Sequence, residues 1–316
     1  MKAYAIDEFG KPGSVREVPL PEPGEGEVRI KVGAASVNPF DSAVVNGYVK
    51  DYMEHRFPLV PSADLSGTVD AIGPGVSEFS PGERVFGLSG KPYQGEGTLA
   101  EYAVASVATI ARTPGQLSDL EAAAFPLVAL SALQMLDAAV VSPGDPVVVI
   151  GASGGIGSFA VQIARARGAH VVAVTSSQNV EYVKGLGAAE VVDRGAGDIL
   201  GALREAHPEG VAAIIDTASD KDELTRLGEA VRNGGVVVSI KRAADPELLA
   251  GRGVKAVNIQ AQPSAEALQE IARMVSAGNL RPPAIQEFSL DNAAEALAKV
   301  GASHGAGKLV VVPGNS

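Results

Sequence analysis

The segment Val147 to Ser177, VVVIGASGGIGSFAVQIARARGAHVVAVTSS, constrains the fold of this chain more than any other. The apolar run at 147–150 is typical of a short strand buried on both faces. A glycine-rich turn follows, and apolar residues at helical spacing then lead to Gly168, which is placed to end a helix. A second apolar run begins at 171. Strand, turn, helix and strand within roughly thirty residues predict a parallel βαβ unit.

The turn GASGGIG indicates what this unit binds. A helix N-terminus presents unpaired N–H groups and the positive end of a dipole, and both attract phosphate. Glycines let the backbone approach that phosphate and let the helix pack closely on the strand. Ala152, Gly154 and Gly157 stand at the three glycine positions of the dinucleotide fingerprint. An ordinary glycine-rich turn is the alternative, and the flanking strand and amphipathic helix favour dinucleotide binding.

The residues after the second strand bear on which dinucleotide is bound. NAD enzymes usually place an acid there, where it bonds the ribose hydroxyls. This chain has hydroxyl and amide side chains at 175–179 and no acid before Glu181. A carboxylate would repel a ribose 2′-phosphate, whereas hydroxyls and amides accept it. The sequence therefore favours NADP(H).

Length, charge and composition exclude several classes of protein. A chain of 316 residues suits two domains. The net charge of −11, with no basic run, argues against nucleic-acid binding. The absence of cysteine excludes disulfides, thiolate metal sites and a cysteine nucleophile. With no signal-peptide core at the N-terminus and no run long enough to span a membrane, we expect a cytoplasmic protein without membrane contact.

The predicted secondary structure changes at Ser118, from short strands to alternating helices and strands. Before it, short strands separated by Gly and Pro turns predict a β barrel or sandwich, most clearly in the alternation at 27–37. Ser118 and Glu121 then form a capping box at the start of a helix. Further on, buried strands at 212–219 and 234–240 alternate with helices at 179–186, 198–206 and 222–232, and helices at 265–277 and 291–300 precede a last strand at 307–313.

Several stretches together resemble the medium-chain dehydrogenase/reductase superfamily, in its zinc-independent, zeta-crystallin-like quinone oxidoreductase branch. They include AASVNPFDSAVVNG (34–47), FPLVPSADLSGTV (57–69), GTLAEYAVAS (97–106), AAAFPLVALSALQML (122–136) and GKLVVVP (307–313), and the likeness covers nearly the whole chain. The resemblance implies an α/β protein with three parts. These are a GroES-like, β-rich catalytic domain at 1–117, a Rossmann NADP-binding domain with a doubly wound parallel sheet at 118–262, and a C-terminal return to the catalytic domain at 263–316. The active site would lie in the cleft between the domains.

The resemblance also implies that this cleft holds no metal. Zinc alcohol dehydrogenases have a cysteine where Asn38 stands and a His-Glu pair where Ala63 and Asp64 stand. Zinc polarises the substrate oxygen in those enzymes. Here, hydride transfer would depend on placing the nicotinamide against an acceptor that is already electron-poor. The alternative is a metal held by Asp41, His55 and Asp64, a poor constellation of one imidazole and two carboxylates.

The family's motifs assign further roles. Asn38 would contact the nicotinamide ribose or the substrate, although with Pro39 it also suits a simple turn. We expect Asp41 to hold its own loop by hydrogen bonds, and Asp64 resembles a structural acid at the start of a strand. Ser131 would contact the coenzyme from a helix, unless its hydroxyl only bonds its own backbone. The other coenzyme-binding candidates are Ala152, Ser153, Gly154, Gly155 and Ile156 in the turn, Ser176, Ser177 and Asn179 after the second strand, Arg194, and Ile240 at the end of GGVVVSI.

Arg194 has the most specific of these roles. It stands where the family's NADPH enzymes often have a tyrosine, and Asn179 stands where they often have a lysine. An arginine can donate two parallel hydrogen bonds to the 2′-phosphate. The alternative interpretation is a surface arginine beside Asp193.

A proton donor is harder to assign. Tyr48, Tyr52 and Tyr93 lie on polar loops beside the cleft motifs, and Tyr52 is the best candidate for a general acid. Water is the alternative donor, and tyrosines in a cleft are often only its walls. His304 stands in a loop that, by resemblance, approaches the coenzyme phosphates, and a solvated loop fits equally well.

Three functions fit these residues. The first is an NADPH-dependent reductase of small quinones or α,β-unsaturated carbonyls, and the second is a tailoring reductase for one specialised metabolite. The third is a non-catalytic NADPH-binding protein with a structural or sensory role. The resemblance further implies a homodimer paired through an edge strand near GGVVVSI.

Overall fold

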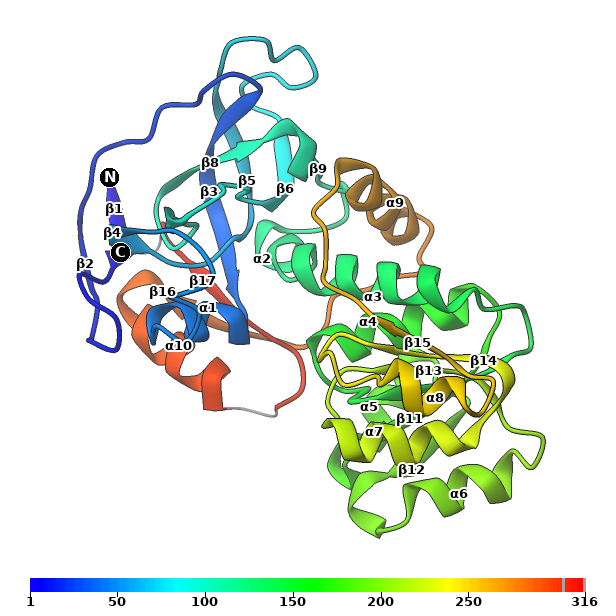
Figure 1. Cartoon of the computed structure of the whole chain (residues 1–316). Coiled ribbons are helices and arrows are strands. Elements are labelled where there is room, and N and C mark those ends of the chain that lie inside the picture. Colours follow the sequence, from blue (N-terminus) through cyan, green and yellow to red (C-terminus); the bar gives the residue numbers. More distant parts are fainter. Residues whose placement is uncertain (303–304, 315–316) are drawn as a thin grey trace. The chain divides into compact units, whose positions relative to one another are not determined.

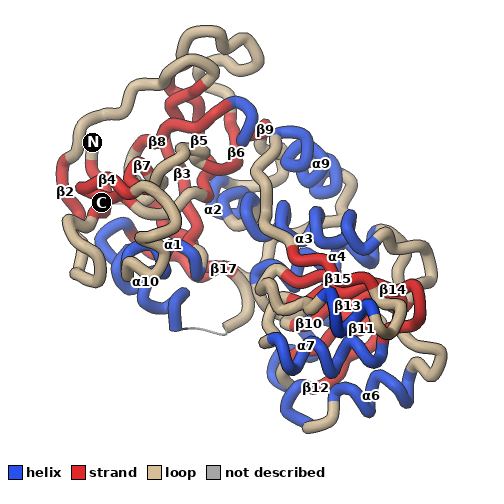
Figure 2. Tube along the Cα trace, viewed as in Figure 1, coloured by secondary structure: helices blue, strands red, loops and turns tan. Residues whose placement is uncertain are grey.

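A computed structural model describes residues 1–302 and 305–314, which form two compact units (Figure 1). The first unit comprises Met1–Leu127 and Pro263–Ser316, and the second comprises Val128–Gln262. The first consists mainly of strands and loops, and the second alternates strands with helices (Figure 2).

The first unit is built on a seven-stranded sheet with the order β16-β17-β3-β5-β6-β9, in which β8 also pairs with β3. The long strand β3 (Glu27–Val37) is its centre, because it pairs antiparallel with β5, β8 and β17. The other strands of this sheet are β5 (Asp64–Ile72), β6 (Arg84–Leu88), β8 (Tyr102–Ser106), β9 (Ile110–Arg112), β16 (Ile285–Ser289) and β17 (Lys308–Val312). Two separate two-stranded sheets pair β1 (Lys2–Ala5) with β2 (Ser14–Glu17) and β4 (His55–Val60) with β7 (Gln94–Glu96). The helices are α1 (Pro39–Val45), α2 (Asp119–Ala123), α9 (Ala265–Ser276) and α10 (Ala293–Ala302), with short 3₁₀ turns η1 (Val107–Thr109) and η5 (Leu290–Asn292).

The end of the chain completes the sheet of the first unit. Strand β17 pairs with β3, so that Val311 lies opposite Ala35, and it pairs in parallel with β16 on its other side. Helix α10 adds Ala296 and Leu297 to the same hydrophobic core as Ile30 of β3. This return of the chain brings Lys308, the first residue of β17, to the end of β3.

The second unit contains a six-stranded parallel sheet with the order β12-β11-β10-β13-β14-β15, which is the order of dinucleotide-binding sheets. Its strands are β10 (Pro146–Ile150), β11 (His170–Thr175), β12 (Glu190–Asp193), β13 (Val211–Asp216), β14 (Val231–Ser239) and β15 (Lys255–Asn258). Its helices are α3 (Pro126–Ala139), whose first two residues belong to the first unit, α4 (Gly155–Ala166), α5 (Val180–Leu186), α6 (Ile199–Ala206), α7 (Lys221–Leu227) and α8 (Pro246–Ala250). Short 3₁₀ turns are η2 (Ser177–Asn179), η3 (Arg194–Ala196) and η4 (Gly228–Ala230).

Both faces of this parallel sheet are covered, as the unbroken apolar runs predict. Successive side chains of a strand point to opposite faces. Val148 and Val172 pack in one core with leucines of α6, α7 and α8. The alternate residues Val147 and Val149 are equally buried, and α4 buries Phe159, so α4 covers the opposite face (Figure 1).

The α/β class and the pairing of a GroES-like unit with a doubly wound sheet are confirmed, but the boundary between the units lies at Leu127 and Val128 instead of 117 and 118. Helix α2 begins at its Ser118 cap as predicted, yet it packs on the first unit. Ser66 donates to the carbonyl of Asp119 at 2.5 Å, and Arg84 pairs with the Asp119 carboxylate at 2.6 Å. These bonds keep the start of the predicted Rossmann domain in the β-rich unit.

Two expectations for the second unit were wrong. The helix predicted at 222–232 ends at Leu227, and strand β14 begins at Val231. The stretch GGVVVSI is not an edge strand, because β14 lies between β13 and β15. Strand β15, Lys255–Asn258, is short and only partly buried, so its sequence gave no strand signal. In the part of the chain that the structure describes, every helix is too short or too polar to span a membrane.

Candidate functional site

The glycine turn joins β10 to α4 and leaves an open space at the start of the helix. Gly151 has a φ of +74°, which favours glycine, and Gly154 is the N-cap residue of α4. A Cβ on Gly157 would lie 2.1 Å from the carbonyl oxygen of Gly151, so only glycine lets the helix come this close to the turn. A Cβ on Gly154 would meet only that same oxygen, at 3.3 Å. Gly157 is therefore required by packing, whereas Gly154 borders free space.

The turn lies where a ligand of such a sheet is expected. Strands β10 and β13 are neighbours, and the chain leaves them toward opposite edges of the sheet. Ligands of doubly wound sheets bind at this point, outside the carboxyl ends of the strands. The first N–H groups of α4, at Gly155 and Ile156, have no acceptor within the helix and point to that end. This arrangement fits the pyrophosphate of a dinucleotide.

Three predicted residues meet beside the turn. Ser153 Oγ accepts hydrogen bonds from Thr175 Oγ1 at 3.0 Å and from Asn179 Nδ2 at 3.1 Å. Asn179 Nδ2 also donates to Ser176 Oγ at 3.0 Å. The turn and the end of β11 are thus joined by small polar groups. Ser177 is exposed and begins the 3₁₀ turn η2.

Arg194 follows β12 and has a carboxylate partner. Thr175 pairs in register with Asp193, so Arg194 and Ser176 each lie one residue beyond neighbouring strand ends. The guanidinium contacts Glu223 Oε2 at 3.1 Å, and its side chain is 47% exposed. An anion near the end of β11 would have to compete with Glu223 for this arginine.

The buried carboxylate of Asp216 shapes the other side of the turn, and sequence reasoning did not single it out. Its oxygens accept from the N–H of Ser219 at 2.8 Å and from Ser239 Oγ at 2.7 Å. The N–H of Ile240 donates to the Asp216 carbonyl oxygen at 3.2 Å. Asp216 therefore fixes the loops after β13 and β14, and with them the position of Ile240. An aspartate that ends an apolar run, as in IIDTAS, is the signal that could have identified it.

A second polar cluster is buried in the first unit, where Asn38, Asp41 and Asp64 meet Lys308. Lys308 Nζ donates to Asn38 Oδ1 at 2.5 Å and lies 3.8 Å from Asp64 Oδ2. Asn38 Nδ2 and Ser36 Oγ donate to the same Asp64 oxygen, at 2.9 and 2.8 Å. The other Asp64 oxygen accepts from the Leu127 N–H at 2.9 Å.

Helix α1 sets the place of Asn38 and Asp41 in this cluster. Asn38 caps the helix, Pro39 begins it, and Asp41 accepts from the Asn38 N–H at 2.7 Å. Asn38 is only 3% exposed, and its amide bonds at both ends within the cluster. The cluster gives Asn38 a structural role, and its contact with the coenzyme or substrate stays a prediction.

Burial shifts the ionisation of two groups in the cluster. It raises the pKa of the Asp41 carboxyl to about 7, against the opposing effect of the hydrogen bond from the Asn38 N–H. Burial lowers the pKa of the Lys308 ammonium, and the charges of Asp64 and Asp41 oppose this shift. Burial thus favours the protonated form of Asp41 over a wider pH range than for an exposed aspartate.

The structure does not bring the three residues of the alternative metal site together as ligands. Among the described residues, Asp41, His55 and Asp64 do not gather their ligand atoms into a metal-sized group. Asp64 instead bonds Asn38 and Ser36 and faces Lys308. His304, the residue predicted to approach the coenzyme phosphates, lies outside the described residues. Lys308, four residues further on, is buried in the polar cluster.

The remaining candidates differ in exposure. Ser131 is buried in α3, and its contact with the coenzyme stays a prediction. Tyr48 and Tyr52 are 76% and 85% exposed. Tyr93 donates to Glu96 at 2.5 Å, and this hydrogen bond raises the pKa of the Tyr93 phenol.

Two family models of dehydrogenases match this chain. Residues 24–115 match the alcohol dehydrogenase GroES-like domain, and residues 186–311 match the zinc-binding dehydrogenase family. The chain is 33% identical over 313 residues to the chloroplastic quinone-oxidoreductase QR1 of Triphysaria versicolor, across 94% of this chain and 93% of that protein.

Two solved structures resemble this chain over nearly its whole length. An alcohol dehydrogenase superfamily protein from Novosphingobium aromaticivorans matches with a TM-score of 0.89 and 28% identity over 99% of both chains. The quinone oxidoreductase from Coxiella burnetii matches with a TM-score of 0.85 and 31% identity, again over 99% of both. Fold and glycine turn together thus define an oxidoreductase of the medium-chain dehydrogenase/reductase superfamily. Within that superfamily the chain belongs to the quinone oxidoreductase branch, as the sequence motifs indicated.

The buried cluster makes Lys308 important for stability. We expect Lys308→Met to destabilise the first unit by about 3–5 kcal/mol, because it leaves the Asp64 carboxylate buried without its cation. Urea unfolding followed by circular dichroism measures the change. Lys299→Met, at an exposed lysine that donates to Gln286, is the matched control and should shift stability by less than about 0.5 kcal/mol. Equal unfolding midpoints for the two variants would contradict a buried ion pair.

Proposed function

We propose that this protein transfers a hydride from NADPH to a small quinone or an α,β-unsaturated carbonyl, without a metal. The glycine turn carries this proposal, because its open space at Gly154 and its packed side at Gly157 suit a dinucleotide phosphate. The quinone class is supported by the names of its relatives in Triphysaria and Coxiella.

The residues of the second unit would hold the coenzyme. The N–H groups of Gly155 and Ile156 would bind the pyrophosphate, and the Ser153, Ser176 and Asn179 cluster would contact the adenosine ribose. Bound NADPH would supply the hydride from C4 of its nicotinamide ring. Small polar groups without a carboxylate at the end of β11 favour the phosphate-bearing coenzyme over NADH.

The acceptor is proposed to react without a Lewis acid. Asn38 and Asp64, at positions where zinc relatives hold ligands, bond each other at 2.9 Å. An electron-poor quinone or enone accepts hydride without polarisation by a metal, so positioning supplies most of the rate. Water is the better proton donor, because the Tyr52 side chain is 85% exposed.

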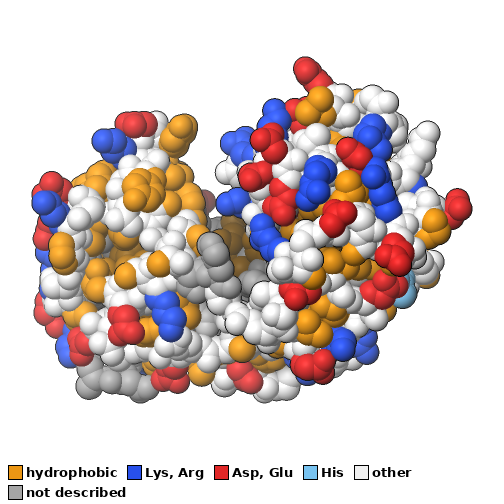
Figure 3. Space-filling model, turned by 90° about the horizontal axis from the view of Figure 1, so that it is seen from below, with side chains coloured by type: hydrophobic (Ala, Val, Ile, Leu, Met, Phe, Trp, Pro, Cys, Tyr) orange, Lys and Arg blue, Asp and Glu red, His pale blue; other side chains and the backbone are white. Residues whose placement is uncertain are grey.

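We further propose a cytoplasmic homodimer whose partners are small molecules. The free edge of β15, in place of β14, is the strand at which a second copy could extend the sheet. Nucleic acid is not a proposed partner. The face in Figure 3 mixes Lys and Arg with Asp and Glu and shows no continuous basic patch.

An assay of NADPH oxidation tests the function. We expect EDTA-treated protein to turn over at least one member of a panel of small quinones and enones, at the rate of untreated protein. Tight NADPH binding without turnover on the whole panel would instead indicate a binding protein. Activity lost together with stoichiometric zinc bound at Asn38 and Asp64 would overturn the metal-free mechanism.

Two glycine variants separate binding from folding. We expect Gly154→Val to abolish NADPH binding and leave the unit folded, because its side chain enters the space meant for phosphate. Gly157→Val should unfold the second unit, because its Cβ would lie 2.1 Å from backbone. Fluorescence titration with NADPH and thermal melting measure the two effects. Unchanged NADPH affinity in the Gly154 variant would overturn the assignment of the turn.

Arg194 and Glu223 together test the coenzyme preference. We expect Arg194→Ala to weaken NADPH binding by about 1.5–3 kcal/mol, the range of a charge-assisted hydrogen bond, and to leave NADH nearly unaffected. Glu223→Gln should strengthen NADPH binding, because it frees the arginine from its competing carboxylate. The measurement is the ratio of kcat/KM for NADPH and NADH. If neither variant changes the ratio, Arg194 is only a surface residue.

A further inference from the structure

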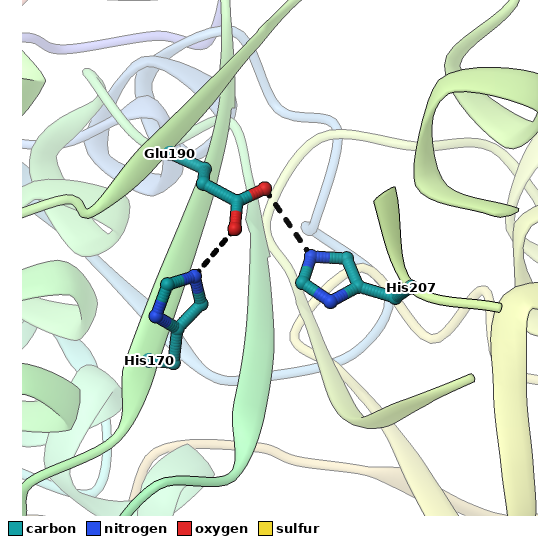
Figure 4. A group of neighbouring side chains, drawn as sticks. All are labelled: His170, Glu190 and His207. Atoms are coloured by element: carbon teal, nitrogen blue, oxygen red, sulfur yellow. Dashed lines mark hydrogen bonds and ion pairs between the residues drawn. The ribbon is translucent and has the colours of Figure 1, made fainter. Parts of the chain in front are cut away.

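Two histidines and a glutamate converge at the opposite end of the Rossmann sheet from the glycine turn. His170 is the first residue of β11, Glu190 is the first residue of β12, and His207 caps the C-terminus of α6. They come from three separate segments of the second unit, and Figure 4 shows both imidazoles directed at the Glu190 carboxylate.

The register of the sheet explains why they meet. Glu190 pairs with Val172, and paired residues of parallel strands share a face. His170 stands two residues before Val172 and therefore lies on that face as well. Val172 packs in one core with Leu203 of α6, so this face is turned to the helix that ends at His207.

The distances suit a metal ion. His170 Nε2 lies 2.5 Å from one oxygen of Glu190, and His207 Nε2 lies 3.3 Å from the other. The three ligand atoms all lie within 4.8 Å of one another. Donors around a tetrahedral zinc ion, bound at about 2.0–2.2 Å, are roughly 3.3 Å apart. Small side-chain rotations would bring all three donors to that spacing.

His207 carries the second observation. Its side chain is only 13% exposed, and its Nε2 atom is buried and makes no hydrogen bond among the described residues, because its contact with Glu190 at 3.3 Å lacks hydrogen-bond geometry. A buried imidazole nitrogen that makes no hydrogen bond is unfavourable unless something binds it. A divalent cation would use its lone pair and at the same time neutralise the carboxylate.

We infer that His170, Glu190 and His207 form a binding site for a divalent transition metal, with Zn²⁺ as the best match. Two imidazoles and a carboxylate are zinc ligands, and water would complete the tetrahedron. The site lies at the amino ends of the strands, whereas the dinucleotide turn lies at the carboxyl ends. It therefore binds apart from the coenzyme, and the inference does not depend on the proposed reaction.

The site has a structural consequence for the sheet. Strand β12 is an edge strand whose four residues are all only partly buried. A metal held by both strands and by the end of α6 would tie this edge to the helix that covers it.

Zinc titration of untagged, EDTA-treated protein tests the inference. We expect one Zn²⁺ per chain by isothermal titration calorimetry. At zinc a hundredfold above Kd, we expect a rise of several degrees in the melting temperature. Glu190→Gln and His207→Gln should each weaken zinc binding at least tenfold.

His55→Gln is the matched control. His55 Nε2 is also buried without a hydrogen-bond partner, but His55 belongs to no group of three ligand side chains among the described residues. This variant should bind zinc like the unaltered protein. Circular dichroism in EDTA establishes that each variant is folded. The inference is overturned if the unaltered protein binds no stoichiometric zinc, or if both folded site variants bind it with unchanged affinity.

Discussion

The buried carboxylate of Asp64 is the contact on which the first unit depends most. One of its oxygens faces Asn38 and Lys308, and the other accepts the N–H of Leu127. These partners come from the start of α1, the start of β17 and the residue at which the unit ends. A charge with no solvent contact is stable only with such a full set of partners. One side chain thus joins the two stretches of sequence that make up this unit.

The sequence predicted those parts of the fold whose signals are local. The apolar run, glycine turn and amphipathic helix around Gly154 specify a βαβ unit within one stretch, and the structure contains it. The capping box of Ser118 and Glu121 fixed the start of a helix for the same reason. The capping box did not indicate which unit this helix packs on. That packing depends on hydrogen bonds to Ser66 and Arg84, which lie far away in the sequence.

Buried polar groups were harder to predict than apolar segments. Lysine is a residue type that usually lies at the surface, yet Lys308 is only 5% exposed. Its burial follows from the return of β17 to β3, a pairing that no local pattern encodes. His170 and His207 likewise lie far apart in the sequence, and only the register of β11 and β12 and the length of α6 bring them to Glu190.

Gly157 and Gly154 are constrained to different degrees by the fold, and this difference has an evolutionary consequence. Gly157 is held in place by the backbone of its own unit, so the fold requires it whatever the protein binds. A Cβ on Gly154 would meet only the carbonyl oxygen of Gly151, at 3.3 Å, so the fold restricts this residue far less. In a descendant that no longer used a dinucleotide, residue 154 would be free to drift while residue 157 stayed glycine. The first sign of a lost coenzyme in such a lineage would be a side chain at 154.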